Sequence, residues 1–433
     1  MPKSQLTWNV TWSEPITIAA LTERLHEVGA GREDLAALLK DRDRELVEQR
    51  CGPWYHPLEN ARFERKGTKK RTLGTRFGKI TVKAHQIYDT QTDEYFVPLW
   101  RDVRLDGQRI YQPDVIALSQ HGTGRMSYRN TREELARTVG GVPSPHTVNR
   151  RVIEDGNLLN LKISEREMTT GAIMPDGTKL HAQKGGHLDA NITLAVSPGK
   201  KPRLRCLTVG KDWKAHKRTL ERTKFCDEKG TTIPPTMISD LEPALVRIMT
   251  PTDGRWHADH VHVPRATAFA LWEDGVGREE RVSVVQTVTG LLAHLRNSLA
   301  LHLPQGETEA VEHRIQQTTK EFRRLGTLLL QKGYRRAAAL LHRVSDHVTT
   351  FATLALQGIT VPWNSNLIER LMGEIMKRCK HRWMNWTTEG AQALLTLLVV
   401  RTLEPDTYAR FFRGKLFGHL STLPNLGIQI TQA

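Results

Sequence analysis

Three carboxylate side chains that lie far apart in the sequence occupy positions where they could act together. Asp176 stands in "MPDGTK", on an expected strand, and Asp240 ends the apolar segment "MISD". Glu369 lies on the amphipathic segment from 364 to 386. Carboxylates that converge repel one another unless cations neutralise them, and their oxygens suit Mg²⁺ or Mn²⁺. Two such ions can activate a nucleophile and stabilise the leaving oxygen in phosphoryl transfer.

Each aspartate also has an ordinary structural interpretation. Asp176 precedes Gly177, and Asp-Gly by itself is a strong turn signal. Asp240 could cap the helix that follows it. Their joint placement favours chemistry, because two strands and a helix are expected between them. Other acids in the same region rank lower: Asp189, Asp212, Glu242 and Asp259.

The helix expected to carry Glu369 has apolar residues at a spacing of three and four, and it becomes basic toward its end. Glu369 falls at the seam between the apolar and basic faces. Glu374 lies further round and is expected to pair with Arg378 at the surface, four residues on. Gly373 is expected to allow another backbone to come close.

The elements around these acids form the outline of a ribonuclease-H-like domain. From Thr170 the sequence predicts three strands, a helix, a strand that ends at Asp240, and a further strand-to-helix step. In such a sheet the first and fourth strands lie side by side, which would bring Asp176 and Asp240 to one edge. Residues 277–356 are mostly helical by pattern. We therefore expect an α/β fold with an all-α insertion.

Basic and helical elements precede this core. Helical periodicity runs from Pro15 to Arg50, and the stretch 62–85 then holds nine Lys or Arg and one acid. A basic β-element that follows phosphates is at least as good an interpretation as a solvated charge run. The segment 127–156 indicates a helix-turn-helix, although any glycine-linked helix pair is the alternative. Its second helix opens with five candidates for base contact: His146, Thr147, Asn149, Arg150 and Arg151.

The overall composition favours a polyanionic partner. The net charge is +16, and nucleic acid is the commonest partner for such a charge. Four cysteines without CxxC spacing argue against disulfides and cysteine-built zinc sites, and indicate a reducing compartment. No apolar run reaches membrane-spanning length, and no signal-peptide pattern is present. We expect a cytoplasmic protein associated with the nucleoid, with no membrane partner.

The ordered set of motifs resembles the DDE transposases of prokaryotic insertion sequences, of the mutator-like kind. It extends roughly over residues 72–398 and includes "TLGTRFGKITVKAHQIYD", "DGT", "SDLEP", "ADHVHVPR" and "NLIERLMGEIMKRCKHRW". The resemblance implies a ribonuclease-H-like core with an all-helical insertion. It implies that Asp176, Asp240 and Glu369 are the catalytic triad and bind two Mg²⁺ or Mn²⁺ ions. It also places His260 beside the active site.

The resemblance further implies cleavage at the ends of an insertion sequence, followed by attack of the freed 3′-hydroxyl on target DNA. The partners would be double-stranded DNA, as terminal inverted repeats and as target, and further copies of the chain in a dimer or larger assembly. Trp383 and Trp386 could stack on bases or belong to the core. Cations expected to follow phosphates are Lys69, Lys70, Arg71, Arg76, Lys377, Arg378, Lys380 and Arg382.

Two departures from that family concern zinc. Many relatives carry paired cysteines near the N-terminus, where this chain has only Cys51. The family's Cys-x-x-His stretch reads His257-Ala-Asp259-His260 here. A zinc site of these residues with His262 is disfavoured, because alternate strand residues face opposite ways.

Two other functions stay open from the sequence. One is a regulatory or domesticated helix-turn-helix protein, and the other is a structure-specific nuclease on the same fold. The expected regions are helical (1–60), basic β (61–105), helix-turn-helix (106–168), first core part (169–262), helical insertion (263–358), closing core helices (359–404) and C-terminal tail (405–433).

Overall fold

A computed structural model describes the chain over most of its length. The described residues are 6–11, 15–53, 62–164, 168–169, 171–197, 199–221, 225–226, 235–252, 255–381, 384–417 and 427–432. They form two compact units. The first unit contains Met1–Glu154 and Asp406–Ala433, and the second contains Asp155–Pro405. All six region boundaries expected from the sequence fall inside one unit or the other, and the division at Glu154 falls inside the expected region 106–168.

The first unit begins with two helices, α1 (Ile18–Glu27) and α2 (Arg32–Cys51). The Thr17 side chain accepts a hydrogen bond from the Ala20 amide and so caps α1. The Asp34 carboxylate accepts the Gly31 amide at 2.7 Å at the start of α2. These caps satisfy amides that have no partner within the helix.

A long hairpin packs against α2. Strands β3 (Phe63–Thr75) and β4 (Gly78–Asp89) pair antiparallel, and β5 (Glu94–Phe96) continues the sheet. From Gly78 to Ala84 every second residue of β4 is buried, and the buried positions then shift to Ile87 and Asp89. These core residues share a cluster with the α2 leucines: Ile80, Val82, Ala84, Leu35, Leu39 and Leu46. Next come α3 (Pro98–Asp102) and β6 (Val103–Arg104), which pairs with β2 (Ile16–Thr17).

Three helices then cover the region expected to be a helix-turn-helix. They are α4 (Pro113–Thr123), α5 (Tyr128–Ala136) and α6 (Pro145–Ser164). Ser144 accepts the Thr147 amide at 3.2 Å and so caps the start of α6. The turn between α5 and α6 lies close to the hairpin, because a Cβ on Gly78 would stand 2.5 Å from the Gly140 carbonyl oxygen.

The segment that the sequence leaves as a C-terminal tail, 405–433, contains regular structure. Residues Pro405–Phe417 form α16, and Gly427–Gln432 form β14, which pairs antiparallel with β1 (Leu6–Thr11). Phe411 and Phe412 are buried, each with 8% of its surface exposed. Burial of these two rings stabilises the packing of α16 on the rest of the first unit.

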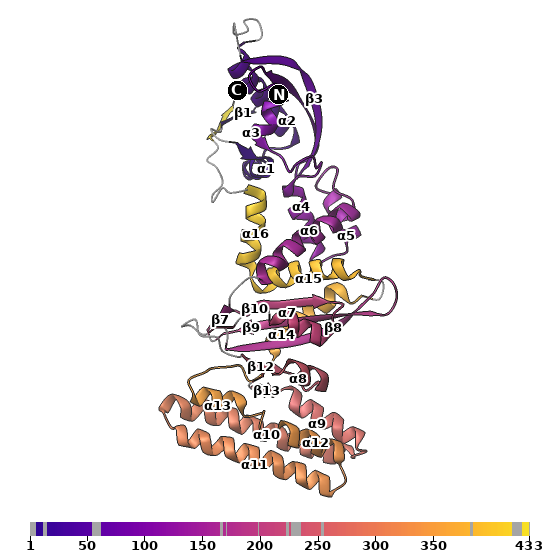
Figure 1. Ribbon diagram of the computed structural model, residues 1–433, viewed down its shortest axis with the longest axis vertical. Helices are drawn as coiled ribbons and strands as arrows, with labels where there is room; N and C mark the ends of the chain where they lie inside the picture. The colour runs from indigo at the N-terminus through magenta and orange to yellow at the C-terminus, as the bar shows by residue number, and fades with distance from the viewer. Residues whose placement is uncertain are drawn as a thin grey trace. The chain divides into compact units, whose positions relative to one another are not determined.

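The second unit is built on a five-stranded mixed sheet, ordered β10-β9-β8-β12-β13 (Figure 1). The first three strands along the chain are antiparallel, whereas β12 runs parallel to both β8 and β13. A separate short pair joins β7 (Met168–Thr169) to β11 (Phe225–Cys226). The five strands are β8 (Ala172–His181), β9 (His187–Val196), β10 (Arg203–Val209), β12 (Thr236–Ser239) and β13 (Trp256–Ala258).

Four helices accompany this sheet. The side-chain amide of Gln392 ties one of them to β10: its oxygen accepts the Val209 amide at 2.9 Å and its nitrogen donates to the Leu207 carbonyl at 2.9 Å. The helices are α7 (Trp213–Leu220), α8 (Pro243–Met249), α14 (Asn366–Cys379) and α15 (Thr388–Leu403).

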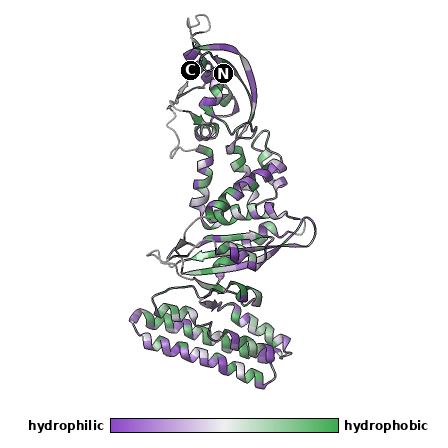
Figure 2. Ribbon diagram, viewed as in Figure 1, coloured by the Kyte–Doolittle hydropathy of each residue, from purple (hydrophilic) through white to green (hydrophobic). Residues whose placement is uncertain are grey.

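Between β13 and α14 the chain forms a helical group that matches the expected insertion in position. Figure 2 shows hydrophobic positions concentrated where these helices face one another. Phe322 and Leu341 are fully buried there. Among helices in the described ranges, none combines the length and apolar character needed to cross a bilayer. The group contains α9 (His262–Glu273), α10 (Arg278–His302), α11 (Thr308–Gln331), α12 (Arg335–Val344), α13 (Thr350–Leu356) and the short 3-10 turn Leu303–Gln305.

Candidate active site

Asp176 and Asp240 come from neighbouring parallel strands. The register pairs Met237 of β12 with Ile173 of β8, and the same offset continued by three residues relates Asp240 to Asp176. Parallel neighbours lie about 4.8 Å apart, and residues at equal offset point to the same face. The sheet therefore carries the two aspartates side by side where β12 ends.

Local hydrogen bonds orient both aspartates, although neither aspartate has the structural role considered for it from the sequence. Asp176 and Gly177 lie within β8 and not in a turn, and Glu242, not Asp240, is the N-cap of α8. The Asp176 carboxylate accepts the Gly177 amide at 2.7 Å. The Asp240 carboxylate accepts the Glu242 amide at 3.2 Å, in the turn that leads into α8. Each bond uses one carboxylate oxygen, so the second oxygen of each aspartate stays available for another contact.

Glu369 reaches the site from the first turn of α14. The helix buries its apolar stripe, including Ile368, Leu371 and Ile375, which leaves Glu369 partly exposed at the edge of that stripe. A carboxylate can only accept, so the His262 Nε2–H donates to Glu369 Oε1 at 2.8 Å. His262 is the first residue of α9.

The electrostatics connect all four side chains. Burial, together with the charges of Asp240 and Glu369, raises the pKa of Asp176 from 3.8 to about 7, although the Gly177 amide and His262 oppose the rise. Asp176, whose pKa lies near 7, stands close to two other acids. A cation bound there would reduce the repulsion among the three carboxylates. The oxygen donors match those that Mg²⁺ and Mn²⁺ prefer.

A buried aspartate fixes the position of α14. Asp259 follows β13 and is fully buried. One of its oxygens accepts the Val261 amide at 2.5 Å, and the other accepts both the Ser365 amide at 2.7 Å and the Ser365 hydroxyl. Ser365 directly precedes α14. Asp259 therefore fixes the point at which α14 begins, and with it the position of Glu369.

Asp259, His262 and Glu369 also form a group whose ligand atoms lie within 4.8 Å of one another. Donors already occupy both Asp259 oxygens, so this carboxylate is better suited to holding the backbone than to binding an ion. Glu369 belongs to both sets of acids. Within the described ranges, no group of this spacing includes Asp176 or Asp240.

The ring of His260 has its hydrogen-bond partners in the helical group and not among the three acids. His260 is buried, with Nε2 2.7 Å from the Val348 carbonyl oxygen and Nδ1 3.1 Å from Arg296. Its burial lowers its pKa well below the usual value. The histidine that meets an acid of the site is His262, two residues on. The chain turns from strand to helix after Ala258, which the pattern of alternating residues does not reveal.

The four residues considered for zinc have separate partners. His257 is fully buried, and its two ring nitrogens lie 3.1 Å from the His347 and Trp363 carbonyl oxygens. The rings of His257 and His260 thus bind carbonyl groups of His347, Trp363 and Val348. The side chains of Asp259 and His262 instead bind Ser365 and Glu369 at the start of α14.

The basic end of α14 divides into exposed and buried cations. Lys377 and Lys380 are exposed, and the Lys380 ammonium lies 3.5 Å from Thr178 Oγ1 on β8. Arg378 was expected to contact phosphate, but it is buried over the Trp386 ring at 5.5 Å. Glu374 pairs at 2.8 Å with Lys377, not with Arg378.

Three other expectations concern this helix and the loop after it. Trp386 is buried, which favours its core interpretation. An added Cβ on Gly373 would meet no atom within 4 Å, so no close backbone approach occurs there. Arg382 and Trp383 lie outside the described residues.

The candidate cations of the first unit also differ in their surroundings. Lys69 and Lys70 are exposed on β3. Arg71 donates to the Gly107 carbonyl, and Arg76 pairs with Glu23. The two lysines are therefore better placed for phosphate than the two arginines.

The start of α6 shows the same division. His146 and Arg150 are exposed, and Thr147 and Asn149 are half-buried. Arg151 was expected to reach bases, but it is buried and its guanidinium pairs with Asp106 and Glu154. A buried arginine cannot contact the edge of a base, so we interpret Arg151 as a structural residue.

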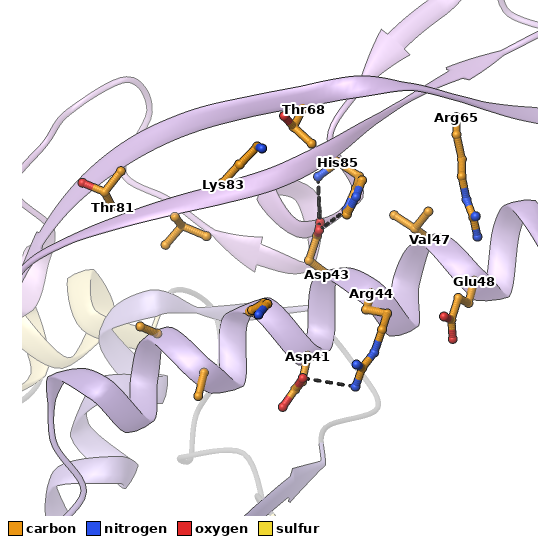
Figure 3. A pocket seen from close by; sticks show the side chains of 14 residues that line it. Asp41, Asp43, Arg44, Val47, Glu48, Arg65, Thr68, Thr81, Lys83 and His85 are labelled. Carbon is orange, nitrogen blue, oxygen red and sulfur yellow. Dashed lines mark hydrogen bonds and ion pairs between the residues drawn. The ribbon is translucent and has the colours of Figure 1, made fainter. Parts of the chain in front are cut away.

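The first unit contains a separate cavity of about 670 Å³ between α2 and the β3–β4 hairpin (Figure 3). Asp43 of α2 is buried at its wall and accepts the His85 backbone amide at 3.1 Å and the ring Nδ1 at 2.6 Å. Asp41 and Arg44 pair at its rim. The three acids of the second unit do not line it.

Comparison of the chain with models of protein families gives no match, and comparison with curated proteins gives none either.

Proposed function

We propose that this protein is a DNA transposase that needs Mg²⁺ or Mn²⁺, cleaves DNA at the ends of an insertion sequence and joins the freed 3′ end to target DNA. One observation carries the proposal. Asp176, Asp240 and Glu369, from three separate elements, lie close enough for the last two charges to raise the pKa of the first. Such convergence of acids is a recognised mark of a functional site.

The sheet supports the finer fold assignment within this proposal. In a ribonuclease-H-like sheet the first and fourth strands are neighbours, and β8 and β12 are the first and fourth of the five strands along the chain. The helical group from α9 to α13 stands between the second and third acids in the sequence. That placement agrees with the resemblance to DDE transposases noted from the motifs.

The chain's own residues would act by binding and positioning. Asp176, Asp240 and Glu369 would hold the ions, and His262 would keep the Glu369 carboxylate turned toward them through its Nε2–H. Lys380 beside β8 could hold a phosphodiester at the same edge. Two divalent ions, when bound, supply the charge that activates the attacking group and stabilises the leaving oxygen.

The first unit would recognise DNA. Its exposed lysines on β3 and the exposed His146 and Arg150 at the start of α6 present donors to phosphates and bases. A chain of net charge +16 is suited to such a partner. Assembly of two or more copies on paired DNA ends is part of the proposal.

A strand-transfer assay tests the proposal. The substrate is a labelled duplex carrying the DNA that flanks the coding region, with supercoiled plasmid as target and Mg²⁺ present. We expect joined products from the native protein and none from Asp176→Asn, Asp240→Asn or Glu369→Gln. Retention of full activity by these variants would contradict the assignment of the three acids. Cleavage without joining by the native protein would identify a nuclease instead. A gel shift checks that the inactive variants still bind DNA.

A further inference from the structure

Helix α9 presents an exposed aromatic face that continues from the candidate active site. Phe269 and Trp272 leave 58% and 60% of their surfaces exposed, more than any other aromatic residue described in the helical group. Their ring centroids lie 5.6 Å apart with the planes tilted by 35°. Exposed apolar surface of this kind in a well-packed helical group indicates an interaction site.

The two rings share one side of α9 with His262 and Arg265. At 3.6 residues per turn, these four residues fall within an arc of about 80°. The opposite side of the helix is buried and includes Val263, Thr267, Ala270 and Leu271. The exposed side thus forms a stripe that starts at His262, the partner of Glu369, and ends at Trp272. We call this stripe (His262, Arg265, Phe269 and Trp272) the α9 stripe.

The charge of the α9 stripe is positive. Arg265 is exposed and makes no ion pair or hydrogen bond within the described ranges. The nearest acid on the same side, Glu273, is already paired with Arg336 at 2.9 Å. An unpaired guanidinium beside two exposed rings is the combination that binds unpaired nucleotides, since the cation attracts phosphate and the rings stack on bases.

We infer that the α9 stripe is a stacking platform for unpaired bases of the DNA strand whose phosphodiester enters the acid cluster. A duplex hides its base faces, so only an unstacked or frayed strand offers a surface that fits the rings. The rings stand about 10–15 Å along the helix axis from His262. That distance corresponds to about three or four nucleotides. The inference rests on the proposed function, because the acid cluster defines which strand is meant.

The test uses the full chain in EDTA, so that no cleavage is required. The probe is a DNA duplex with a four-nucleotide unpaired tail that carries 5-iodo-2′-deoxyuridine at one position. We expect irradiation to crosslink the tail to the peptide containing Phe269 and Trp272. We also expect Trp272→Ala to weaken binding of the tailed duplex by about 5- to 100-fold relative to a blunt duplex, and Trp272→Phe to restore most of it.

A matched control is Leu301→Ala on α10, which removes a side chain that is also 58% exposed in the same helical group. It should leave the preference for the tail unchanged. Crosslinks that map elsewhere, or a Trp272→Ala variant with native preference, would overturn the inference. Loss of self-association in Trp272→Ala, measured by sedimentation, would assign the stripe to a second copy and overturn it as well.

The outcomes for the two proposals can be told apart. If the tail crosslinks to Trp272 while no strand transfer is found with Mg²⁺, the platform stands and the transposase proposal fails. If strand transfer proceeds equally well in the Phe269→Ala, Trp272→Ala double variant and no crosslink forms, the transposase proposal stands and the stacking platform fails.

Discussion

Asp259 binds Ser365 through both the backbone amide and the hydroxyl of the serine, although 106 residues separate them in the sequence. The chain leaves the sheet at Asp259, builds the helical group, and returns at Ser365 to begin α14. This contact joins the residues that precede and follow the helical group in the sequence. It also means that Glu369 is positioned by a residue that need not touch substrate.

Loss of the Ser365 hydroxyl should reduce activity more than stability. Ser365→Ala keeps the backbone bond to Asp259 but removes the side-chain donor, which costs about 1 kcal/mol of unfolding free energy. Glu369 then loses a fixed starting point, so we expect strand transfer to fall by about 10-fold. Urea unfolding and the strand-transfer assay measure the two effects.

Ser345→Ala is the matched control, because Ser345 is a buried serine whose hydroxyl donates to the His342 carbonyl at 3.0 Å, away from the acids. It should lose similar stability and keep its activity. Equal losses of activity in the two variants would contradict the role given to the Asp259–Ser365 contact.

The raised pKa of Asp176 predicts a pH-dependent stability in the absence of metal. The unfolded carboxyl ionises near pH 3.8, whereas the folded one stays protonated until about pH 7. Stability present at low pH is therefore lost as the pH rises from about 4 to 7, by on the order of 2–4 kcal/mol. Asp176→Asn should escape this loss and exceed the native protein in stability at pH 8 in EDTA.

The comparison is made by urea unfolding at pH 5 and pH 8, as the difference between variant and native protein. Buried histidines such as His216 and His257, whose pKa values burial lowers, contribute equally to both and cancel. Added Mg²⁺ should stabilise the native protein at pH 8 and have less effect on Asp176→Asn. A difference that does not change with pH would contradict the assigned environment of Asp176.

His262 should matter through the proton it donates to Glu369. His262→Ala removes the donor, and we expect strand transfer to fall by about 10- to 100-fold, as for other residues that orient metal-binding side chains. His262→Gln retains an N–H donor and should recover part of the activity. The informative measurement is the Mg²⁺ concentration at half-maximal rate, which should rise in the alanine variant.

His294→Ala in α10 is a useful control, since it removes a histidine of the helical group without altering the Glu369 contact. An unchanged Mg²⁺ requirement in His262→Ala would show that the 2.8 Å contact has no positioning role.

Arg150 and Arg151 are adjacent and should behave differently. Arg150→Ala removes an exposed cation, so DNA affinity should fall and the salt dependence of binding should decrease by about one ion. Arg151→Ala removes a buried guanidinium, but Asp106 and Glu154 keep Arg109 as a partner, so we expect a loss of about 1–2 kcal/mol in stability. Titrations at several salt concentrations and thermal unfolding separate the two; a reversed pattern would contradict the burial of Arg151.

The buried Asp43 predicts a stability effect confined to the first unit. Asp43→Ala leaves the His85 amide and ring without their acceptor, which should cost about 2–3 kcal/mol. Asp41→Ala removes an exposed pair with Arg44 from the same cavity and should cost less than about 0.5 kcal/mol. Limited proteolysis with fragment mapping would show whether the first unit alone is destabilised; similar costs for the two variants would argue against the Asp43–His85 contact.

The elements of both units followed largely from local sequence patterns. The period-two pattern of β4, the apolar strand before Asp240 and the amphipathic α14 are all visible in a single stretch of sequence. The placement of Asp176 and Asp240 on adjacent strands needed a hypothesis about strand order, and the pairing of β8 with β12 agrees with it.

The remaining site features depend on contacts between distant segments. Nothing near Arg151 in the sequence distinguishes it from Arg150, because its burial depends on Asp106, forty-five residues away. The pairing of His262 with Glu369 joins residues 107 positions apart. The "DHVH" motif could have directed attention to His262 as well as His260, but the switch from strand to helix decides which of them reaches the acid.

The pairing of β1 with β14 has a consequence for synthesis. Residues 6–11 are made early, but their partner strand 427–432 is made only after the whole second unit. At 5–20 residues per second, about 250 residues of the second unit take roughly 12–50 s to translate. The second unit can therefore fold on the ribosome while the first unit still lacks β14 and α16. Completion of the first unit is thus delayed until residues 427–432 have been made.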